Sequence, residues 1–425
     1  MDKKTLRICY VSNYLPGHHW HAGGAEQAIL ATANLMKEKG AEVSFLTLPQ
    51  DKDHRGCAKV KSIRTAEYFS FWLKKYVEIF KWYVFQFDPL SYFLSRNYFL
   101  ENRPDIAHFG NFQFLTFGAL LSAKRLKIKV VLSIYDYWYF CPLTTLLEHR
   151  GGICRRFHGL WCARCLPARF SIIQRFFLIL RKGIFDFFLK KVDRFFVLSQ
   201  SSKQILVDYG IENDKVSVIR LPLPDDFEQP QNPQYEQKEE SVLFVGWLQK
   251  RKGLHILLEA MSIVWQERPQ VKLNIVTQKV KWEQEYEDLI QSKLRNIPPD
   301  KYVVLLGQRK REEIRDLMRS AAVVIVPEQW ENMSPLIVIE AMSLSRPVVA
   351  SNIGGIPELI EDGREGLLAA YQEPADFAKK ISILLNNKEM RGTIGRNANI
   401  KIRRMLSKEI IASQYMEEYE KSRVS

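Results

Sequence analysis

Three consecutive cations follow a predicted strand in the second half of the chain. The strand 241–245 leads into Gly246, and the loop after it holds Lys250, Arg251 and Lys252 before a glycine and an amphipathic helix. Cations at the carboxyl end of a strand, beside the positive dipole of a helix N-terminus, suit a diphosphate. A solvated basic loop is the alternative that this segment alone leaves open.

The segment from Pro327 to Met342 carries glutamates after another predicted strand, at 323–326. Glu340 falls inside an apolar helical pattern, where a carboxylate is costly unless it binds something. A carboxylate that accepts hydrogen bonds from a vicinal diol is a common way to hold a ribose. The pattern therefore indicates a nucleotide site at the end of this strand.

Gly23 and Gly24 stand in the first strand–helix connection of the chain. Paired glycines let the backbone come close to a ligand, and the helix N-terminus behind them offers free N–H groups to a phosphate. A plain tight turn would use the same two residues, so the pair by itself leaves both interpretations open.

Four of the six cysteines, Cys141, Cys154, Cys162 and Cys165, fall within the loop 141–165. Four thiolates that end in a C-x-x-C pair suit a tetrahedral structural zinc in a reducing compartment. An iron–sulfur cluster uses the same ligands, and free thiols or a transient disulfide are the alternatives. We expect a structural metal site here rather than a catalytic one.

The elements that must position these residues are alternating strands and helices. Strand-like apolar runs alternate with helical patterns along all 425 residues, as in βα units with parallel sheets. The predicted strands are 6–12, 43–48, 105–109, 130–135, 194–199 and 216–221, then 241–245, 271–276, 302–306, 323–326, 347–350 and 366–368. Neither G-x-G-x-x-G nor G-x-x-x-x-G-K-[ST] occurs, which weakens the dehydrogenase and nucleotide-hydrolase classes.

A proline-rich polar stretch over 222–240 interrupts this alternation, as a linker does. We therefore predict an α/β protein with an N-terminal Rossmann-like domain over 1–221 and a C-terminal one over 241–407. A helix over 408–425 is expected to pack back across the domains. Open parallel sheets bind ligands beyond the carboxyl ends of their strands, so the loops named above are where chemistry is expected.

The order and spacing of several motifs resemble those of the retaining nucleotide-sugar glycosyltransferases of family 4, also called glycosyltransferase group 1. The motifs are Lys252-Gly253 after the first strand of the second domain, Glu331…Glu340-Ala341-Met342, Gly354-Gly355-Ile356-Pro357-Glu358 and Asp362-Gly363-Arg364-Glu365-Gly366-Leu367-Leu368. The resemblance implies the GT-B fold, in which two Rossmann-like parallel-sheet domains face a central cleft. The first of these domains would bind the acceptor and the second the nucleotide-sugar donor.

The resemblance also assigns roles to residues. Lys252 would contact the donor diphosphate, Glu331 the donor sugar and Glu340 the ribose, with Glu331 and Lys252 as the catalytic pair. The donor-binding set that it implies comprises Gly23, Gly24, Gly246, Arg251, Lys252, Glu331, Ser334, Pro335, Leu336 and Glu340. Within it, the backbone at 334–336 would hold phosphate, and Gly23 and Gly24 would face the same group.

Three positions depart from the family pattern. Eight residues separate Glu331 from Glu340 where the family usually has seven, so the loop must bulge by one. Trp247 stands where an arginine is typical, and Tyr135 stands where the family often has a histidine. The acceptor side of catalysis is therefore left without an assigned residue.

The implied activity is transfer of a sugar from a UDP- or GDP-linked donor to a glycan or lipid-linked saccharide, with retention, as in surface polysaccharide assembly. Leaving-group stabilisation would come from Lys252 and backbone amides, without a cofactor or divalent metal. A nucleotide-sugar epimerase, a phosphorylase-like enzyme with pyridoxal phosphate and a non-catalytic nucleotide-sugar binder are the alternatives.

The net charge of +14 favours anionic partners. Between Arg169 and Phe195, seven basic residues are interleaved with seven phenylalanines, and a second aromatic and basic block runs from Tyr68 to Phe99. Such segments suit the anionic face of a membrane, although a core helix with a polar face is equally consistent with them. No nucleic-acid-binding motif occurs, and without a secretory signal the protein is expected in the cytoplasm, peripheral at the inner membrane face.

Overall fold

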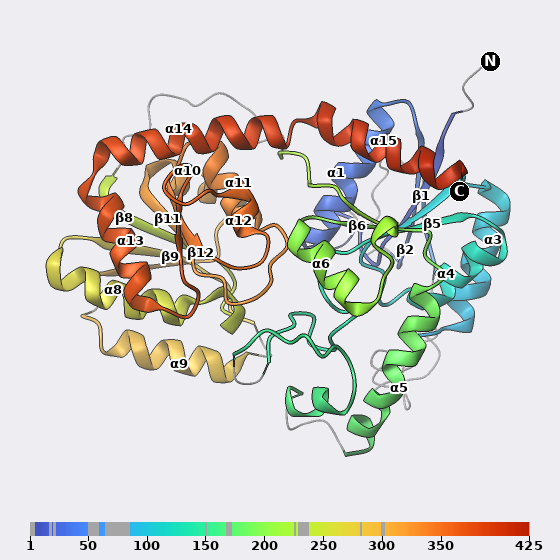
Figure 1. Ribbon diagram of the computed structural model, residues 1–425, viewed down its shortest axis with the longest axis horizontal. Coiled ribbons are helices and arrows are strands. Elements are labelled where there is room, and N and C mark those ends of the chain that lie inside the picture. The colour runs from blue at the N-terminus through green and yellow to red at the C-terminus, as the bar shows by residue number, and fades with distance from the viewer. Residues whose placement is uncertain are drawn as a thin grey trace. The chain divides into compact units, whose positions relative to one another are not determined.

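The computed structural model describes residues 5–16, 19, 23–49, 59–63, 86–148, 151–166, 172–224, 227, 238–280, 283–298 and 302–424. The chain divides into two compact units. Met1–Pro222 and Lys408–Ser425 form the first unit, and Leu223–Ser407 form the second. Each unit contains one parallel sheet with helices packed on it (Figure 1).

The sheet of the first unit has seven strands in the order β3-β2-β1-β4-β5-β6-β7. Their bounds are β1 Arg7–Val11, β2 Glu42–Thr47, β3 Lys59–Ser62, β4 Ile106–Phe109, β5 Lys129–Ser133, β6 Arg194–Val197 and β7 Val216–Val218. The helices are α1 Gly24–Glu38, α3 Pro89–Asn102, α4 Thr116–Arg125, α5 Ile172–Leu189 and α6 Gln200–Tyr209, with short 3-10 turns η3 Leu160–Arg164 and η4 Asn213–Lys215.

The sheet of the second unit has six strands in the order β10-β9-β8-β11-β12-β13. Their bounds are β8 Lys238–Val245, β9 Lys272–Val276, β10 Val303–Gly307, β11 Ala321–Val326, β12 Val348–Ser351 and β13 Leu367–Ala369. Its helices are α8 Leu254–Glu267, α9 Gln284–Arg295, α10 Arg311–Ser320, α11 Leu336–Ser343, α12 Ile356–Leu359, α13 Pro374–Asn386 and α14 Lys388–Met405, with the 3-10 turn η5 Lys250–Lys252.

The structure confirms the α/β class and each of the twelve predicted strands, to within a few residues. Every described strand pair is parallel, and the central strands are apolar runs, as is typical of parallel sheets that helices cover on both faces. The strand that the prediction missed is β3. It has four residues, Lys-Val-Lys-Ser, at the edge of its sheet, where lysines and short length are typical.

The strand order reverses once in each sheet, beside β1 in the first unit and beside β8 in the second. β8 pairs with β9 on one side and with β11 on the other. The loops that follow β8 and β11 therefore leave the sheet next to each other, at the kind of crevice where open α/β sheets bind ligands.

The C-terminal helix α15 (Lys408–Val424) belongs to the first unit, where it packs on α1. Its Tyr419 hydroxyl lies 2.6 Å from Nδ1 of His108 on β4 and 3.1 Å from the hydroxyl of Tyr10 on β1. The second ring nitrogen of His108 lies 2.7 Å from the hydroxyl of Ser133. All four groups are buried, so this hydrogen-bonded cluster fixes where α15 docks on the unit.

His108 should make the first unit sensitive to acid. Burial lowers its pKa from 6.5 to about 3. Between these two pH values the unfolded chain binds the proton and the folded chain does not, so the free energy of unfolding falls as the pH falls through this window. The free energy of unfolding can be measured with urea between pH 4 and 6. We expect His108→Gln to reduce its dependence on pH by about 1 kcal/mol per pH unit.

His255 provides a control for this prediction, because burial lowers its pKa to about 4 and it lies in the second unit. His255→Gln should therefore leave the acid sensitivity of the first unit unchanged. His158, whose pKa burial also lowers to about 3, keeps part of the slope in both variants. Equal slopes in wild type and His108→Gln would contradict the assignment.

Candidate donor site

The loop after β8 is held in place by two glycines. The N–H of Gly246 donates to the carbonyl of Val276, continuing the sheet for one residue. At Gly253, which precedes α8, φ is +72° and a Cβ would lie 1.8 Å from the carbonyl oxygen of Pro327. No side chain fits there, so glycine is required for the β8 and β11 loops to touch.

Lys252 ends the turn η5 and points its ammonium at a buried carboxylate. Its Nζ lies 2.6 Å from Oε1 of Glu328, in the loop after β11. The Lys252 side chain is 23% exposed, whereas that of Glu328 is 3% exposed. The lysine side chain is therefore partly open to solvent, whereas the carboxylate is closed off.

Glu328 accepts hydrogen bonds from two further side chains of its own loop. Nδ2 of Asn332 donates to Oε1 at 3.1 Å, and the indole N–H of Trp330 donates to Oε2. No role was predicted from the sequence for Glu328, Trp330 or Asn332. The signal that could have identified Glu328 is its place two residues after an apolar strand, where a buried carboxylate is costly without partners.

Arg251 also joins the two loops. Its carbonyl accepts from the N–H of Gln329 at 2.8 Å, and its guanidinium stacks over the Trp330 ring at 4.7 Å. The Nε of Arg251 donates to the side chain of Gln249 at 3.0 Å. The predicted donor-site residues Gly246, Arg251 and Lys252 thus lie in the loop after β8, which is bonded to the loop after β11.

Glu340 is buried in α11, as the apolar pattern around it predicted. Its Oε1 lies 3.2 Å from Nη2 of Arg311, the first residue of α10. Arg311 is a further residue that sequence reasoning missed. Because the carboxylate has this cationic partner, its burial does not by itself require a bound ribose.

Four more residues of the predicted donor set, Glu331, Ser334, Pro335 and Leu336, lie in the connection from β11 to the first residue of α11. Glu331 and Ser334 are buried, and the N–H of Ser334 donates to Oδ1 of Asn332 at 3.3 Å. Pro335 directly precedes α11, which begins at Leu336. The loop rests on the glycine pair after β12, since the N–H of Gly355 donates to the carbonyl of Asn332 at 2.8 Å.

Gly23 and Gly24 lie at the start of α1 in the first unit. The N–H of Gly23 donates to Oε2 of the buried Glu26 at 2.8 Å, and Nδ2 of Asn111 donates to its other oxygen at 2.7 Å. This helix N-terminus therefore already carries a carboxylate of its own. The presence of this carboxylate was not predicted from the two glycines. A phosphate bound at this helix N-terminus would have to lie beside Glu26.

The four clustered cysteines are free thiols. Among the described residues, no three histidine, cysteine, aspartate or glutamate side chains are grouped to hold a metal ion. Cys141, Cys154, Cys162 and Cys165 are nonetheless neighbours, since burial and then the charges of the other three raise the pKa of Cys162 to about 12. The described side chains thus do not form the predicted site, and a bound zinc or iron–sulfur cluster stays a prediction from spacing.

Backbone hydrogen bonds hold the cysteine loop in this arrangement. The N–H of Cys141 donates to Tyr137 and that of Cys154 to Leu146, each at 2.7 Å, and Leu147 forms an antiparallel bridge with Ile153. These backbone bonds by themselves give the loop a defined conformation.

Apolar side chains are exposed where η3 packs on α5 in the first unit. They are Leu160, Trp161, Ile179, Leu180 and Phe187. Cations lie over two of the rings: the Arg164 guanidinium is 4.6 Å from the Trp161 centroid, and Lys191 Nζ is 4.3 Å from that of Phe187. No helix in the described part of the chain is long and apolar enough to cross a membrane. Residues 64–85 of the second aromatic block, and 167–171 of the first, lie outside the described residues.

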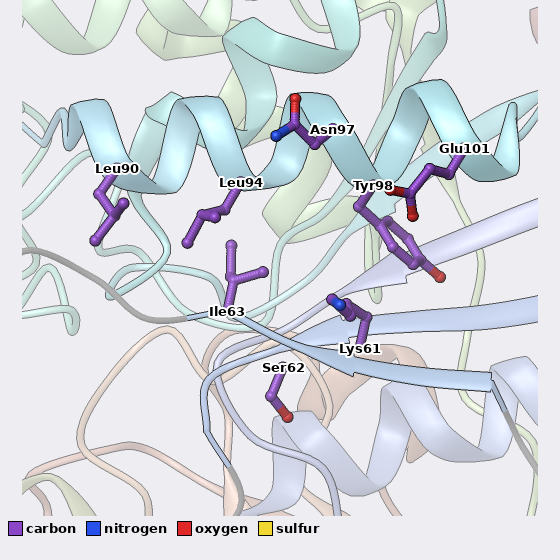
Figure 2. A pocket seen from close by; sticks show the side chains of 8 residues that line it. All are labelled: Lys61, Ser62, Ile63, Leu90, Leu94, Asn97, Tyr98 and Glu101. Atoms are coloured by element: carbon purple, nitrogen blue, oxygen red, sulfur yellow. The ribbon is translucent and has the colours of Figure 1, made fainter.

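A cavity between β3 and α3 contains no residue of the predicted donor set. Figure 2 shows its apolar end, where Leu90 and Leu94 on α3 face Ile63, and its polar end at Lys61 and Glu101. The cavity belongs to the edge of the first sheet and so does not bear on the donor site.

Two family models match consecutive parts of the chain. The model for Glycosyltransferase Family 4 matches residues 22–226, and the model for glycosyl transferases group 1 matches residues 225–401. An uncharacterized glycosyltransferase of Methanocaldococcus jannaschii is 30% identical over 155 residues, which are 36% of this chain and 41% of that protein. Spore coat protein SA of Bacillus subtilis is 30% identical over 185 residues, or 43% and 49% of the two chains. The matched region thus spans less than half the length of either relative.

Solved structures share the fold over nearly the whole chain. HepE of Anabaena, in complex with UDP, superposes with a TM-score of 0.70 at 17% identity and covers 98% of this chain and 100% of its own. Sucrose-phosphate synthase of Thermosynechococcus elongatus gives a TM-score of 0.70 at 18% identity, covering 98% of each chain. From the two family models and two Rossmann-like parallel-sheet units, we conclude that the chain belongs to the family 4, group 1 glycosyltransferases and has the GT-B fold.

Proposed function

We propose that this protein transfers a sugar from a UDP- or GDP-linked donor, with retention, to a hydroxyl of a glycan or lipid-linked saccharide in surface polysaccharide synthesis. The observation that carries the proposal is the Lys252 ammonium, held by Glu328 at the switch point of the second sheet. HepE, which has the same fold, has been solved with UDP and with UDP-glucose, and this favours a uridine nucleotide.

In this proposal Lys252 meets the negative charge that develops on the leaving diphosphate, and preorganised charge of this kind is usually the largest catalytic contribution. Glu331 contacts the donor sugar and Glu340 the ribose. Two-carboxylate retaining chemistry needs a pair about 5 Å apart across the sugar, and we assign no such nucleophile. The leaving phosphate takes the proton of the acceptor hydroxyl, and no metal or cofactor takes part.

Calorimetric titration of the full chain with UDP and with GDP tests the donor assignment. We expect one of the two to bind, and Glu340→Ala to weaken it at least tenfold because a charged hydrogen-bond acceptor for the ribose is lost. Glu361→Ala, which removes an exposed carboxylate of the same unit, is the control. If neither nucleotide binds the folded wild type, the donor proposal fails. Conversion of the sugar nucleotide without an acceptor would favour an epimerase instead.

We further propose that the exposed apolar side chains of η3 and α5, Leu160, Trp161, Ile179, Leu180 and Phe187, bind the anionic inner face of the cell membrane. Aromatic rings with stacked cations gain both from the interface and from acidic headgroups. A lipid-linked acceptor would be presented at the same surface.

Co-sedimentation with vesicles checks this second proposal. We expect binding to vesicles containing phosphatidylglycerol but not to pure phosphatidylcholine, and we expect Trp161→Ala combined with Phe187→Ser to weaken it about tenfold or more, because two exposed rings are lost. Ile400→Ser, which removes an apolar side chain exposed on α14 of the other unit, is the control. Equal sedimentation of all three proteins would contradict the assignment of this surface.

A further inference from the structure

We propose that Glu328 is a positioning residue, which holds the Lys252 ammonium in the orientation that meets the donor diphosphate. The inference rests on the proposed function, because it takes Lys252 as a diphosphate ligand. It goes beyond that function because it assigns a positioning role to a carboxylate that does not itself contact the donor. Its basis is the fixed hydrogen-bond geometry of the Lys252–Glu328 pair.

Glu328 is a rigid acceptor. It lies two residues after the end of β11, its side chain is 3% exposed, and both of its carboxylate oxygens accept hydrogen bonds from side chains of its own loop, Trp330 and Asn332. Because both of its oxygens are hydrogen-bonded within the loop, the carboxylate has a fixed position. The Lys252 Nζ that bonds to it is therefore held in a fixed position as well.

Lys252 has hydrogen-bonding capacity left for a ligand. An ammonium carries three N–H donors, and within the described part of the chain the one hydrogen bond of its Nζ is to Glu328, at 2.6 Å. The other two N–H groups are therefore available to a ligand, and the side chain that carries them is 23% exposed. Fixing a flexible lysine in this way lowers the entropy that it loses when it binds an anion.

The loops that carry the two residues cannot drift apart. Gly253, beside Lys252, lies against the carbonyl of Pro327, beside Glu328, and the Gln329 N–H donates to the Arg251 carbonyl at 2.8 Å. The pair therefore differs from a surface ion pair, whose geometry is not fixed by its surroundings. A purely structural role for Glu328, as the acceptor for Trp330 and Asn332, is the competing explanation that the experiment must exclude.

A double-mutant cycle separates the two explanations. The dissociation constants of UDP and GDP are measured for wild type, Glu328→Gln, Lys252→Ala and the double variant. We expect Glu328→Gln to raise the dissociation constant of whichever nucleotide binds. The increase should be about tenfold in the wild-type background and less than twofold in the Lys252→Ala background. Glu328→Asp, which keeps the charge, should recover part of the affinity.

Glu365→Gln is the matched control. Glu365 is also a buried carboxylate paired with a lysine of the second unit, Lys401, at 3.1 Å. We expect it to leave nucleotide affinity unchanged while changing thermal stability to a similar degree as Glu328→Gln. Glu328→Gln removes the charge and keeps the length, whereas Glu328→Asp keeps the charge and shortens the side chain. If one of the two variants fails to fold, nucleotide affinity can still be measured for the other.

Two results would contradict the role of Glu328 while leaving the proposed donor site intact. One is an equal loss of affinity from Glu328→Gln in both backgrounds, as a structural role predicts. The other is no loss in the wild-type background. A different result, wild-type protein that binds neither UDP nor GDP, overturns the proposed donor site and the inference together, so the two failures are distinguishable.

Discussion

If the proposed donor site is right, Lys252→Ala is expected to lower the rate of sugar transfer by about 10²–10³-fold, because in that proposal Lys252 is the preorganised charge that meets the leaving diphosphate. Affinity for the free nucleoside diphosphate should fall less, by about tenfold, since the charge that develops on the leaving group is largest in the transition state. Single-turnover assays with the sugar nucleotide, together with calorimetry, measure the two effects separately.

Lys401→Ala is the control for this variant. The two lysine side chains have similar exposure, 23% for Lys252 and 27% for Lys401, and each is paired with a nearly buried glutamate of the second unit. Both variants lose one charge and one ion pair, so their stabilities should change alike. Equal loss of transfer in both would show that the effect of Lys252→Ala comes from folding rather than from the donor.

Gly253→Ala is expected to separate the β8 and β11 loops and to abolish nucleotide binding. The new Cβ would lie 1.8 Å from the Pro327 carbonyl oxygen, which is backbone and cannot swing away. Left-handed backbone at a non-glycine residue costs about 1–2 kcal/mol, and forced overpacking adds about 1–3 kcal/mol. Thermal unfolding and calorimetry with the bound nucleotide measure the two consequences.

Gly307→Ala isolates the backbone contribution. Its φ of +65° is close to the +72° of Gly253, and a Cβ there would meet nothing within 4 Å. We expect it to cost about 1–2 kcal/mol and to leave nucleotide affinity intact. If Gly253→Ala behaves like Gly307→Ala, the close contact between the two loops is not what holds the donor site.

Local pattern was enough for the strands and for locating the basic loop between β8 and α8. Parallel strands buried on both faces must be continuous apolar runs, so β8 and β11 could be found without any knowledge of their partners. The residues at their carboxyl ends, Lys252 among them, then followed from the general place of ligands in such sheets. For the metal site, cysteine spacing predicted four ligands, whereas no three potential ligands are grouped among the described side chains, so a bound metal remains a prediction.

The sequence by itself determined the α/β class, the strand positions, the glycine-rich turns and the basic loop that ends in Lys252, because each depends on residues within a few positions of one another. The tertiary structure decided which partners those residues have. Lys252 and Glu328 are 76 positions apart, and His108 and Tyr419 are 311 apart. Such pairs leave no periodic signal in the chain. They exist because the sheet sets β8 beside β11 and because α15 returns to the first unit, where buried polar groups must find partners.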